Sequence, residues 1–279
     1  MNSATPIASQ ILWPAAPMEW PTLHGQVHVW AGSLDGSGEA INRSRAMLSA
    51  EELSRAARFH FEVHRNRFIT GRALVRAVLG RYLGVEPTQV EFAYGPNGKP
   101  VLAGRFASAA LHFNLAHSAN LALLAVTAAG PIGVDLEHIR PLDDFEELVA
   151  RFFSPRESAA FQALPPAQRP AAFYNLWTCK EALLKATGEG IASLLNRVEL
   201  SVLPAAPVSL LALPAQFGVP NDWTIHELCP CREFAAALAV KATNISLQCW
   251  RRPDLPLTHP PTHLLTSSRS PAALRIPSA

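Results

Sequence analysis

Two long segments of the chain carry hydrophobic residues at helical spacing. The first covers about Arg65 to Tyr82, and its apolar positions are Phe68, Leu74, Val75, Val78 and Leu79. Residues three and four apart share one face of a helix, so this segment is predicted to be helical. A second long helix is predicted from about Pro170, which suits a first turn, to Ala186, with Gly188 as its stop.

A capping box precedes each long helix. Ser49 is followed by Glu52, which predicts a helix starting near Ala50. Ser154 is followed by Pro155 and Glu157, which is a stronger start of the same kind. The shared order of short helix, long helix and strands suggests two similar α+β lobes with a cleft between them, a usual place for a ligand.

Alternating and fully apolar runs predict the strands. They are Val27–Leu34, Val90–Tyr94, Pro100–Leu102, Leu111–Leu115, Leu121–Thr127 and Ile132–Ile139, and residues 198–240 are rich in further strand signals. We therefore expect an irregular lead-in over residues 1–22, an N-terminal lobe over 23–130 and a C-terminal lobe over 131–245. Residues 246–279 are rich in proline and are predicted to be a disordered tail.

Composition excludes several classes of function. Charged residues make up 16% of the chain and the formal net charge is +2, which argues against a nucleic-acid-binding surface. The longest apolar stretch, Leu121–Val134, is broken by glycine and proline, so we expect no membrane span. Met1–Trp20 does not resemble a signal peptide, and four cysteines without a CxxC pair favour a reduced, cytoplasmic location.

Two acids lie close together in one predicted strand. Asp135 and Glu137 are two residues apart, so they project from the same face while Val134 and Leu136 project from the other. Adjacent carboxylates repel each other unless a cation or solvent lies between them. A hard divalent cation such as Mg²⁺ would resolve the conflict, because it prefers oxygen ligands. The alternative is an exposed strand face with two solvated acids.

A third acid belongs to the second long helix. Trp177, Glu181 and Lys185 are four residues apart and share one helix face. Glu181 and Lys185 would form an ordinary surface ion pair if that face were solvated. The tryptophan indicates that the face is partly buried, and a buried Glu181 needs a partner, such as a metal shared with the strand acids. Lys180 and Lys185 would then stand near phosphates of a metal-bound ligand.

Further basic residues are candidates for binding anions. His117 follows a strand, Lys99 lies at a tight turn, and several arginines, Arg58 and Arg67 among them, fall in or near the first long helix. Arginine binds phosphate through two parallel hydrogen bonds. Each residue also has an ordinary explanation: a local hydrogen bond at a turn, an exposed turn lysine, or a solvated helix face.

Taken together, the motifs and their order resemble the Sfp-type 4′-phosphopantetheinyl transferases. The resemblance covers about residues 45–240 and rests on Gly98-Lys99-Pro100, Phe113–Ser118, Gly133–Glu137, Phe153–Glu157, Trp177–Glu181 with Lys185, and Gly188–Gly190. It implies an α+β monomer of two pseudo-duplicated lobes, with coenzyme A bound in the cleft between them. The lead-in and the proline-rich tail lie outside it.

The resemblance also implies roles for individual residues. Asp135, Glu137 and Glu181 are expected around Mg²⁺, with Lys185 near the diphosphate of coenzyme A. In some accounts of such enzymes, the carboxylate that matches Glu181 instead deprotonates the incoming serine.

The 3′-phosphate and adenosine of coenzyme A are expected to meet other residues. The resemblance places Lys99 and His117 there. Of the arginines, Arg58 and Arg67 are our choices to assist them.

The implied reaction transfers the 4′-phosphopantetheine arm of coenzyme A to a serine of an apo acyl or peptidyl carrier protein and releases adenosine 3′,5′-bisphosphate. One alternative is another Mg²⁺-dependent transferase that cleaves a diphosphate. A second is a non-catalytic module that binds carrier proteins. The sequence does not specify which carrier proteins are served.

Overall fold

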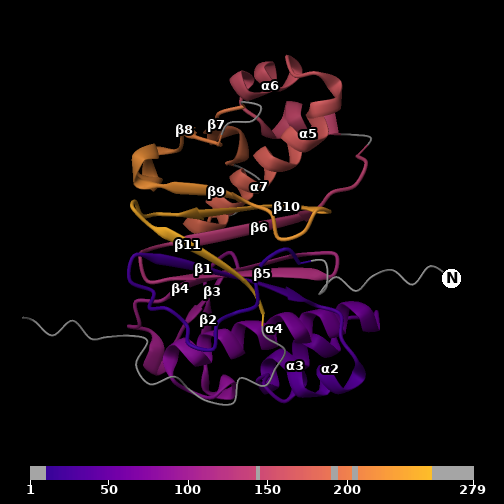
Figure 1. Ribbon diagram of the computed structural model, residues 1–279, viewed down its shortest axis with the longest axis vertical. Coiled ribbons are helices and arrows are strands. Elements are labelled where there is room, and N and C mark those ends of the chain that lie inside the picture. The colour runs from indigo at the N-terminus through magenta and orange to yellow at the C-terminus, as the bar shows by residue number, and fades with distance from the viewer. Residues whose placement is uncertain (1–10, 143–144, 190–193, 203–206, 253–279) are drawn as a thin grey trace, which may run out of the picture.

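Two β-sheets lie face to face between two long helices in a computed structural model (Figure 1), which describes residues 11–142, 145–189, 194–202 and 207–252. The order of layers is α4 (Glu62–Leu83), the larger sheet, the smaller sheet and α7 (Arg169–Thr187). The chain is therefore an α+β protein, as the sequence predicts.

The N-terminal half forms the layers around α4. Its helices are α2 (Gly38–Arg45), α3 (Ala50–Ala57) and α4. Its main sheet has the order β11-β1-β5-β4, with β1 at Gln26–Ser33, β4 at His112–Ser118, β5 at Leu121–Thr127 and β11 at Ser246–Arg251. A small hairpin joins β2 (Phe92–Tyr94) to β3 (Pro100–Leu102), and 3₁₀ turns lie at Pro87–Gln89 and Gly104–Phe106.

The C-terminal half forms the layers around α7. Its helices are α5 (Phe145–Phe152), α6 (Pro155–Gln162) and α7. Its sheet has the antiparallel order β6-β10-β9, with β6 at Ile132–His138, β9 at Thr224–Leu228 and β10 at Phe234–Val240. A hairpin joins β7 (Glu199–Leu200) to β8 (Leu210–Ala212). Short 3₁₀ turns lie at Pro166–Gln168, Leu195–Arg197, Ala215–Phe217 and Pro220–Asp222.

Apolar side chains fill the space on both faces of each sheet. Val29 and Leu123 of the larger sheet meet Val134 and Leu238 of the smaller sheet in a central core. On the outer faces, α4 packs against one sheet and α7 against the other, each with its own apolar cluster. Because one face of β6 is committed to the central core, its polar residues face α7.

The last described strand corrects the predicted tail. Residues 246–251 were expected to be disordered, but they form β11, which pairs in parallel with β1 and buries Trp250. The physical reason is tertiary: the strand finds its partner at the opposite end of the sequence. Residues 253–279 of the predicted tail lie outside the described residues.

The lead-in is also attached to the N-terminal half. Residues 11–22 contain no helix or strand, but Trp20 is buried and its ring lies 4.0 Å from that of Trp30, between centroids. Two short helices that the sequence analysis did not predict are also present: α2 contacts α4, and α5 contacts α7. In the part of the chain that the structure describes, no helix combines the length and the apolar character needed to cross a bilayer.

Candidate functional site

The site begins with an unusually close contact between β6 and α7, made possible by a glycine. A Cβ atom at Gly133 would lie 2.1 Å from the carbonyl oxygen of Ala182 and 2.4 Å from the backbone nitrogen of Ala186. Only a residue without a side chain permits this approach. The contact brings the polar face of β6 against the last two turns of α7.

Asp135 is the most buried acid of that face. Its side chain is only 4% exposed, and Oδ1 lies 2.5 Å from Nζ of Lys185 on α7. Its second oxygen, Oδ2, is buried and has no hydrogen-bond partner among the residues that the structure describes. A buried carboxylate oxygen without a partner is costly, so this atom is available for a ligand that can bind it.

Glu137 and Glu181 lie within the electrostatic field of Asp135. Burial, and then the charge of Asp135, raise the pKa of Glu181 to about 7, although Lys185 opposes the shift. The pKa of Glu137 is raised by the same two causes in the same order and is lowered by a hydrogen bond from Ser118. The charge of Asp135 thus acts on both of the other acids that the sequence analysis proposed as its partners.

The carboxylate oxygens of these acids are the kind of ligand that a hard divalent cation prefers, although the described side chains are not spaced to hold one. Within the described residues, no three His, Cys, Asp or Glu side chains are arranged closely enough to hold a metal ion. Asp135 nevertheless keeps one buried oxygen without a partner, and two neighbouring carboxyl groups are held toward their neutral forms. A divalent cation would satisfy that oxygen and relieve the mutual repulsion.

Cations line the same region. Burial lowers the pKa of His117 on β4, and the positive charges of Lys185 and then Arg67 lower it further. Arg67 on α4 forms two hydrogen bonds with Asp35, from Nε to Oδ1 at 2.7 Å and from the guanidinium to Oδ2 at 3.1 Å. His117 therefore lies in the field of Lys185 from one half of the molecule and of Arg67 from the other.

Lys99 joins the β2–β3 hairpin to the end of α7. Its Nζ donates to the carbonyl oxygens of Ile132 at 2.9 Å, Lys185 at 2.6 Å and Ala186 at 3.2 Å. Burial lowers the pKa of Lys99 to about 8. A cavity of about 500 Å³ opens beside it, lined in part by His112. Lys99 can face an anion in this cavity only by exchanging one of its carbonyl partners.

Lys180 does not point to this site. It is fully buried, and its Nζ contacts Glu157 at 2.7 Å and the carbonyl oxygens of Leu195 and Val198 at 2.7 and 2.6 Å. These three contacts use all three ammonium protons inside the C-terminal half. The expectation that Lys180 stands near phosphates therefore disagrees with the structure.

Arg58 also stands apart from the acids. It is the C-cap residue of α3, it is exposed, and nothing in the described part of the chain links it to them. Of the two arginines chosen from the sequence, Arg67 is the one that the structure places in the field of the site. Gly190 of the last quoted motif lies outside the described residues.

Sequence reasoning missed several residues that shape the site. Ser118 donates to Glu137 and accepts from the backbone of His138, and Asn114 accepts from the backbone of Val134. Both side chains tie β4 to β6 across the two halves. Their signal was present in the sequence, because Asn114 and Ser118 are four residues apart on one strand and so share a face. No pattern in the sequence pointed to Asp35 as a residue of the site.

Comparisons with known proteins agree with the resemblance seen in the motifs. Residues 131–239 match the model of the 4′-phosphopantetheinyl transferase superfamily, and residues 35–129 match that of the 4′-phosphopantetheinyl transferase N-terminal domain. The chain is 44% identical over 241 residues to 4′-phosphopantetheinyl transferase HetI of Nostoc sp., covering 86% of this chain and 98% of HetI.

Two other relatives are more distant. A 4′-phosphopantetheinyl transferase of Bacillus subtilis is 31% identical, with 61% of this chain and 73% of the relative covered. The transferase AcpT of Salmonella typhimurium is 40% identical, with 52% and 69% covered.

Proposed function

The chain belongs to the 4′-phosphopantetheinyl transferase superfamily, and we propose that it transfers the phosphopantetheine arm of coenzyme A to a serine of a carrier protein with the help of Mg²⁺. The observation that carries this proposal is the group formed by the buried Asp135 and Glu181 with the half-buried Glu137 and Lys185. Three acids that can bind a divalent cation, together with one lysine, suit the neutralisation of a diphosphate.

The ion would be held by Asp135, Glu137 and Glu181. Support comes from the buried Oδ2 of Asp135, which has no partner, and from the raised pKa values of the other two acids. Mg²⁺ bound there would supply positive charge next to the diphosphate oxygens. In the coenzyme-free protein Lys185 is paired with Asp135, and a bound diphosphate gives this lysine a second anion to stabilise.

The reaction forms one phosphorus–oxygen bond and breaks another. The serine oxygen of the carrier attacks the β-phosphorus of coenzyme A, and the bond from this phosphorus to the bridging oxygen breaks. Adenosine 3′,5′-bisphosphate leaves, and the serine proton must pass to a base. Glu181, whose pKa is about 7, is suited to accept a proton near neutral pH. Serving as a metal ligand and accepting the proton are both compatible with its position.

The adenosine end of the coenzyme is assigned to the N-terminal half. The charges of Lys185 and Arg67 both act on His117, and Lys99 lines a neighbouring cavity. We propose that these three residues bind the 3′-phosphate and the adenosine. Arginine and lysine both bind phosphate, the former through a fixed pair of donors.

The proposal is tested by incubating the protein with apo carrier protein, coenzyme A and Mg²⁺ and weighing the carrier by mass spectrometry. We expect a mass gain of one phosphopantetheine arm. Asp135→Asn should lower the rate by roughly 10²- to 10³-fold, because it removes an ionised ligand of the Mg²⁺ whose charge acts in the transition state. Glu39→Gln on α2, where the side chain is exposed, removes the same charge far from the acids and should leave the rate unchanged.

The rival functions give different results in this assay. If the protein cleaves another diphosphate with Mg²⁺ but never modifies a carrier, it is a different transferase. If it binds apo carrier equally well with Asp135 replaced, and no transfer occurs, it is a binding module. A panel of apo carriers from fatty acid, polyketide and non-ribosomal peptide systems would identify the substrates.

We further propose that the protein acts as a monomer in the cytoplasm. The resemblance to the family implies a monomer, and none of the four cysteines, all of which lie in the described residues, forms a disulfide, which suits a reducing compartment. Sedimentation at working concentration tests the first statement. A dimer that loses activity on dilution would contradict it.

A further inference from the structure

Arg67 is held by a carboxylate that the proposed reaction does not use. Asp35 accepts two hydrogen bonds from its guanidinium group, in the parallel arrangement that arginine also makes with phosphate. The side chain of Arg67 is 27% exposed and that of Asp35 is 47% exposed. A pair this exposed contributes little free energy, so a stronger anion can replace the carboxylate.

Asp35 is presented by an ordered turn at the end of β1. The hydroxyl of Ser33 accepts a hydrogen bond from the backbone nitrogen of Asp35 at 3.3 Å and donates to its carbonyl oxygen at 3.0 Å. The backbone of Leu34 donates to Asn120 beside the β4–β5 turn at 2.8 Å. The backbone that carries Asp35 is therefore anchored, while its carboxylate is held, among the described residues, only by Arg67.

The region repeats one arrangement twice. Lys185 is paired with Asp135, and Arg67 is paired with Asp35. His117 feels both cations, which disfavour its charged form. The protein thus neutralises two cations of the proposed coenzyme site with its own carboxylates. Asp135 has a further use as a metal ligand, whereas Asp35 has none in the reaction.

We propose that Asp35 is an internal competitor for the 3′-phosphate of the coenzyme: its carboxylate occupies Arg67 in the free protein and is displaced when the phosphate binds. This inference rests on the proposed function, because it assigns Arg67 to the coenzyme. Displacement lowers the affinity for ligands that carry the 3′-phosphate. It has no effect on ligands that lack this group, since they do not compete for Arg67.

The test compares two pairs of ligands. Isothermal titration measures the binding of adenosine 3′,5′-bisphosphate and adenosine 5′-monophosphate to the wild type and to Asp35→Asn. Carrier labelling gives KM for coenzyme A and for dephospho-coenzyme A. In the variant, we expect both ligands with a 3′-phosphate to bind about 2- to 5-fold more tightly, the range that an exposed ion pair allows. The two ligands without it should bind as before.

Two further variants separate competition from simple charge. Glu39→Gln removes one negative charge from an exposed pair with Arg43 in the neighbouring α2, and it should shift none of the four constants. In an Arg67→Gln background, Asp35→Asn should lose its effect, because the residue for which the carboxylate competes is gone.

Two results would overturn the inference. If Asp35→Asn weakens binding of the 3′-phosphate ligands, Asp35 orients Arg67 instead of competing with the phosphate. If all four ligands tighten equally, the effect is one of net charge. Neither result would contradict the proposed function, which fails only if the wild type does not transfer phosphopantetheine to any apo carrier.

Discussion

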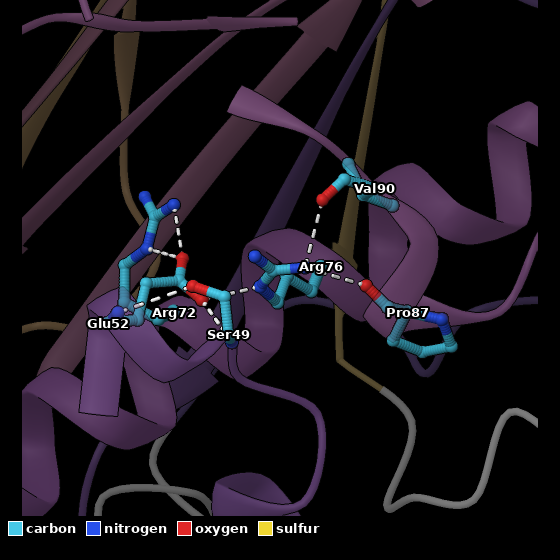
Figure 2. A network of polar contacts seen from close by, with 6 residues as sticks. All are labelled: Ser49, Glu52, Arg72, Arg76, Pro87 and Val90. Atoms are coloured by element: carbon cyan, nitrogen blue, oxygen red, sulfur yellow. Dashed lines mark hydrogen bonds and ion pairs between the residues drawn. The ribbon is translucent and has the colours of Figure 1, made fainter. Parts of the chain in front are cut away.

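The two halves of the molecule hold their long helices with similar buried ion pairs, and the N-terminal one is drawn in Figure 2. Glu52, in the capping box of α3, contacts Arg72 and Arg76 of α4, each at 2.6 Å. Arg76 also donates to the carbonyl oxygens of Pro87 and Val90 after that helix. The network ties a short helix, a long helix and the following turn together.

The C-terminal half repeats this network with different residues. Glu157, in the capping box of α6, contacts Lys180 of α7 at 2.7 Å. Lys180 donates to the carbonyl oxygens of Leu195 and Val198, which are three residues apart like their counterparts in the other half. The Lys180–Glu157 pair is completely buried and has one cation, whereas Glu52 in the N-terminal half contacts two.

The position of the cation in each long helix is also the same. Arg76 stands eight residues before Gly84, and Lys180 stands eight before Gly188, the left-handed glycines that end α4 and α7. The two halves therefore place one cation and one left-handed glycine at matching positions of their long helices. The halves differ at the next position, where α7 has Glu181 and α4 has an alanine. Both halves thus share the ion pair, whereas only the C-terminal half has an acid at this position, which we propose serves the reaction.

The largest effect on stability is expected when Lys180, the cation that pairs with Glu157, is removed. Lys180→Met leaves the buried Glu157 without its cation, although the backbone nitrogens of Ser154 and Leu200 still donate to it, and should lower the free energy of unfolding by about 3 to 5 kcal/mol. Arg76→Met should cost clearly less, because Glu52 keeps Arg72. Urea unfolding measures both. Arg156→Met, which removes an exposed pair with Glu199, serves as the control and should change stability by under about 0.5 kcal/mol. Equal losses for Lys180→Met and Arg76→Met would remove the distinction between the two networks.

A smaller effect, dependent on pH, is expected from the acid that only the C-terminal half carries. The pKa of Glu181 is about 7 in the folded protein, raised from 4.5 by burial and by Asp135. Between these values the folded state keeps a proton that the unfolded chain releases, so the contribution of Glu181 to stability falls as pH rises through the window. Glu181→Gln should match the wild type near pH 4.5 and exceed it at pH 8 by at most roughly 3 kcal/mol.

Thermal unfolding with a chelator present measures this difference. Adding Mg²⁺ should narrow it at pH 8, because an ion that binds the ionised carboxylates stabilises the wild type. A difference between variant and wild type that stays constant from pH 5 to 8 would show that Glu181 is not perturbed as described.

The smallest effects on stability are expected from replacing two glycines, one in each half. The two substitutions compare how closely the long helices are packed. Gly133→Ala forces β6 away from α7 and should lower stability by about 1 to 3 kcal/mol while reducing transfer. A Cβ at Gly71 of α4 would meet Leu34 at 3.6 Å, an ordinary contact. Gly71→Ala should therefore be neutral or stabilising by up to about 1 kcal/mol. Circular dichroism melts measure the change in stability, and carrier labelling measures the change in transfer. A Gly133→Ala variant with unchanged stability would contradict the close contact.

The sequence was most informative where structure is local. The capping boxes at Ser49 and Ser154 predicted the starts of α3 and α6, and a period of two placed Asp135 and Glu137 on one face of β6. These features depend on residues a few positions apart.

The same reasoning failed where the partner is distant in sequence. Lys180 pairs with a glutamate of another helix, so its position beside Glu181 was a poor guide to its role. The pairing of Asp35 with Arg67 joins residues 32 positions apart. No local pattern predicts such contacts, and β11, which pairs with β1, was missed for the same reason.

The return of β11 to β1 has a consequence for synthesis on the ribosome. The larger sheet lacks one edge strand until residues 246–251 have emerged, long after β1. At ordinary translation rates this delay lasts tens of seconds. During that time β1 offers an unpaired edge, the kind of surface on which nascent chains associate wrongly. Shortening the chain before residue 246 would make that transient exposure permanent.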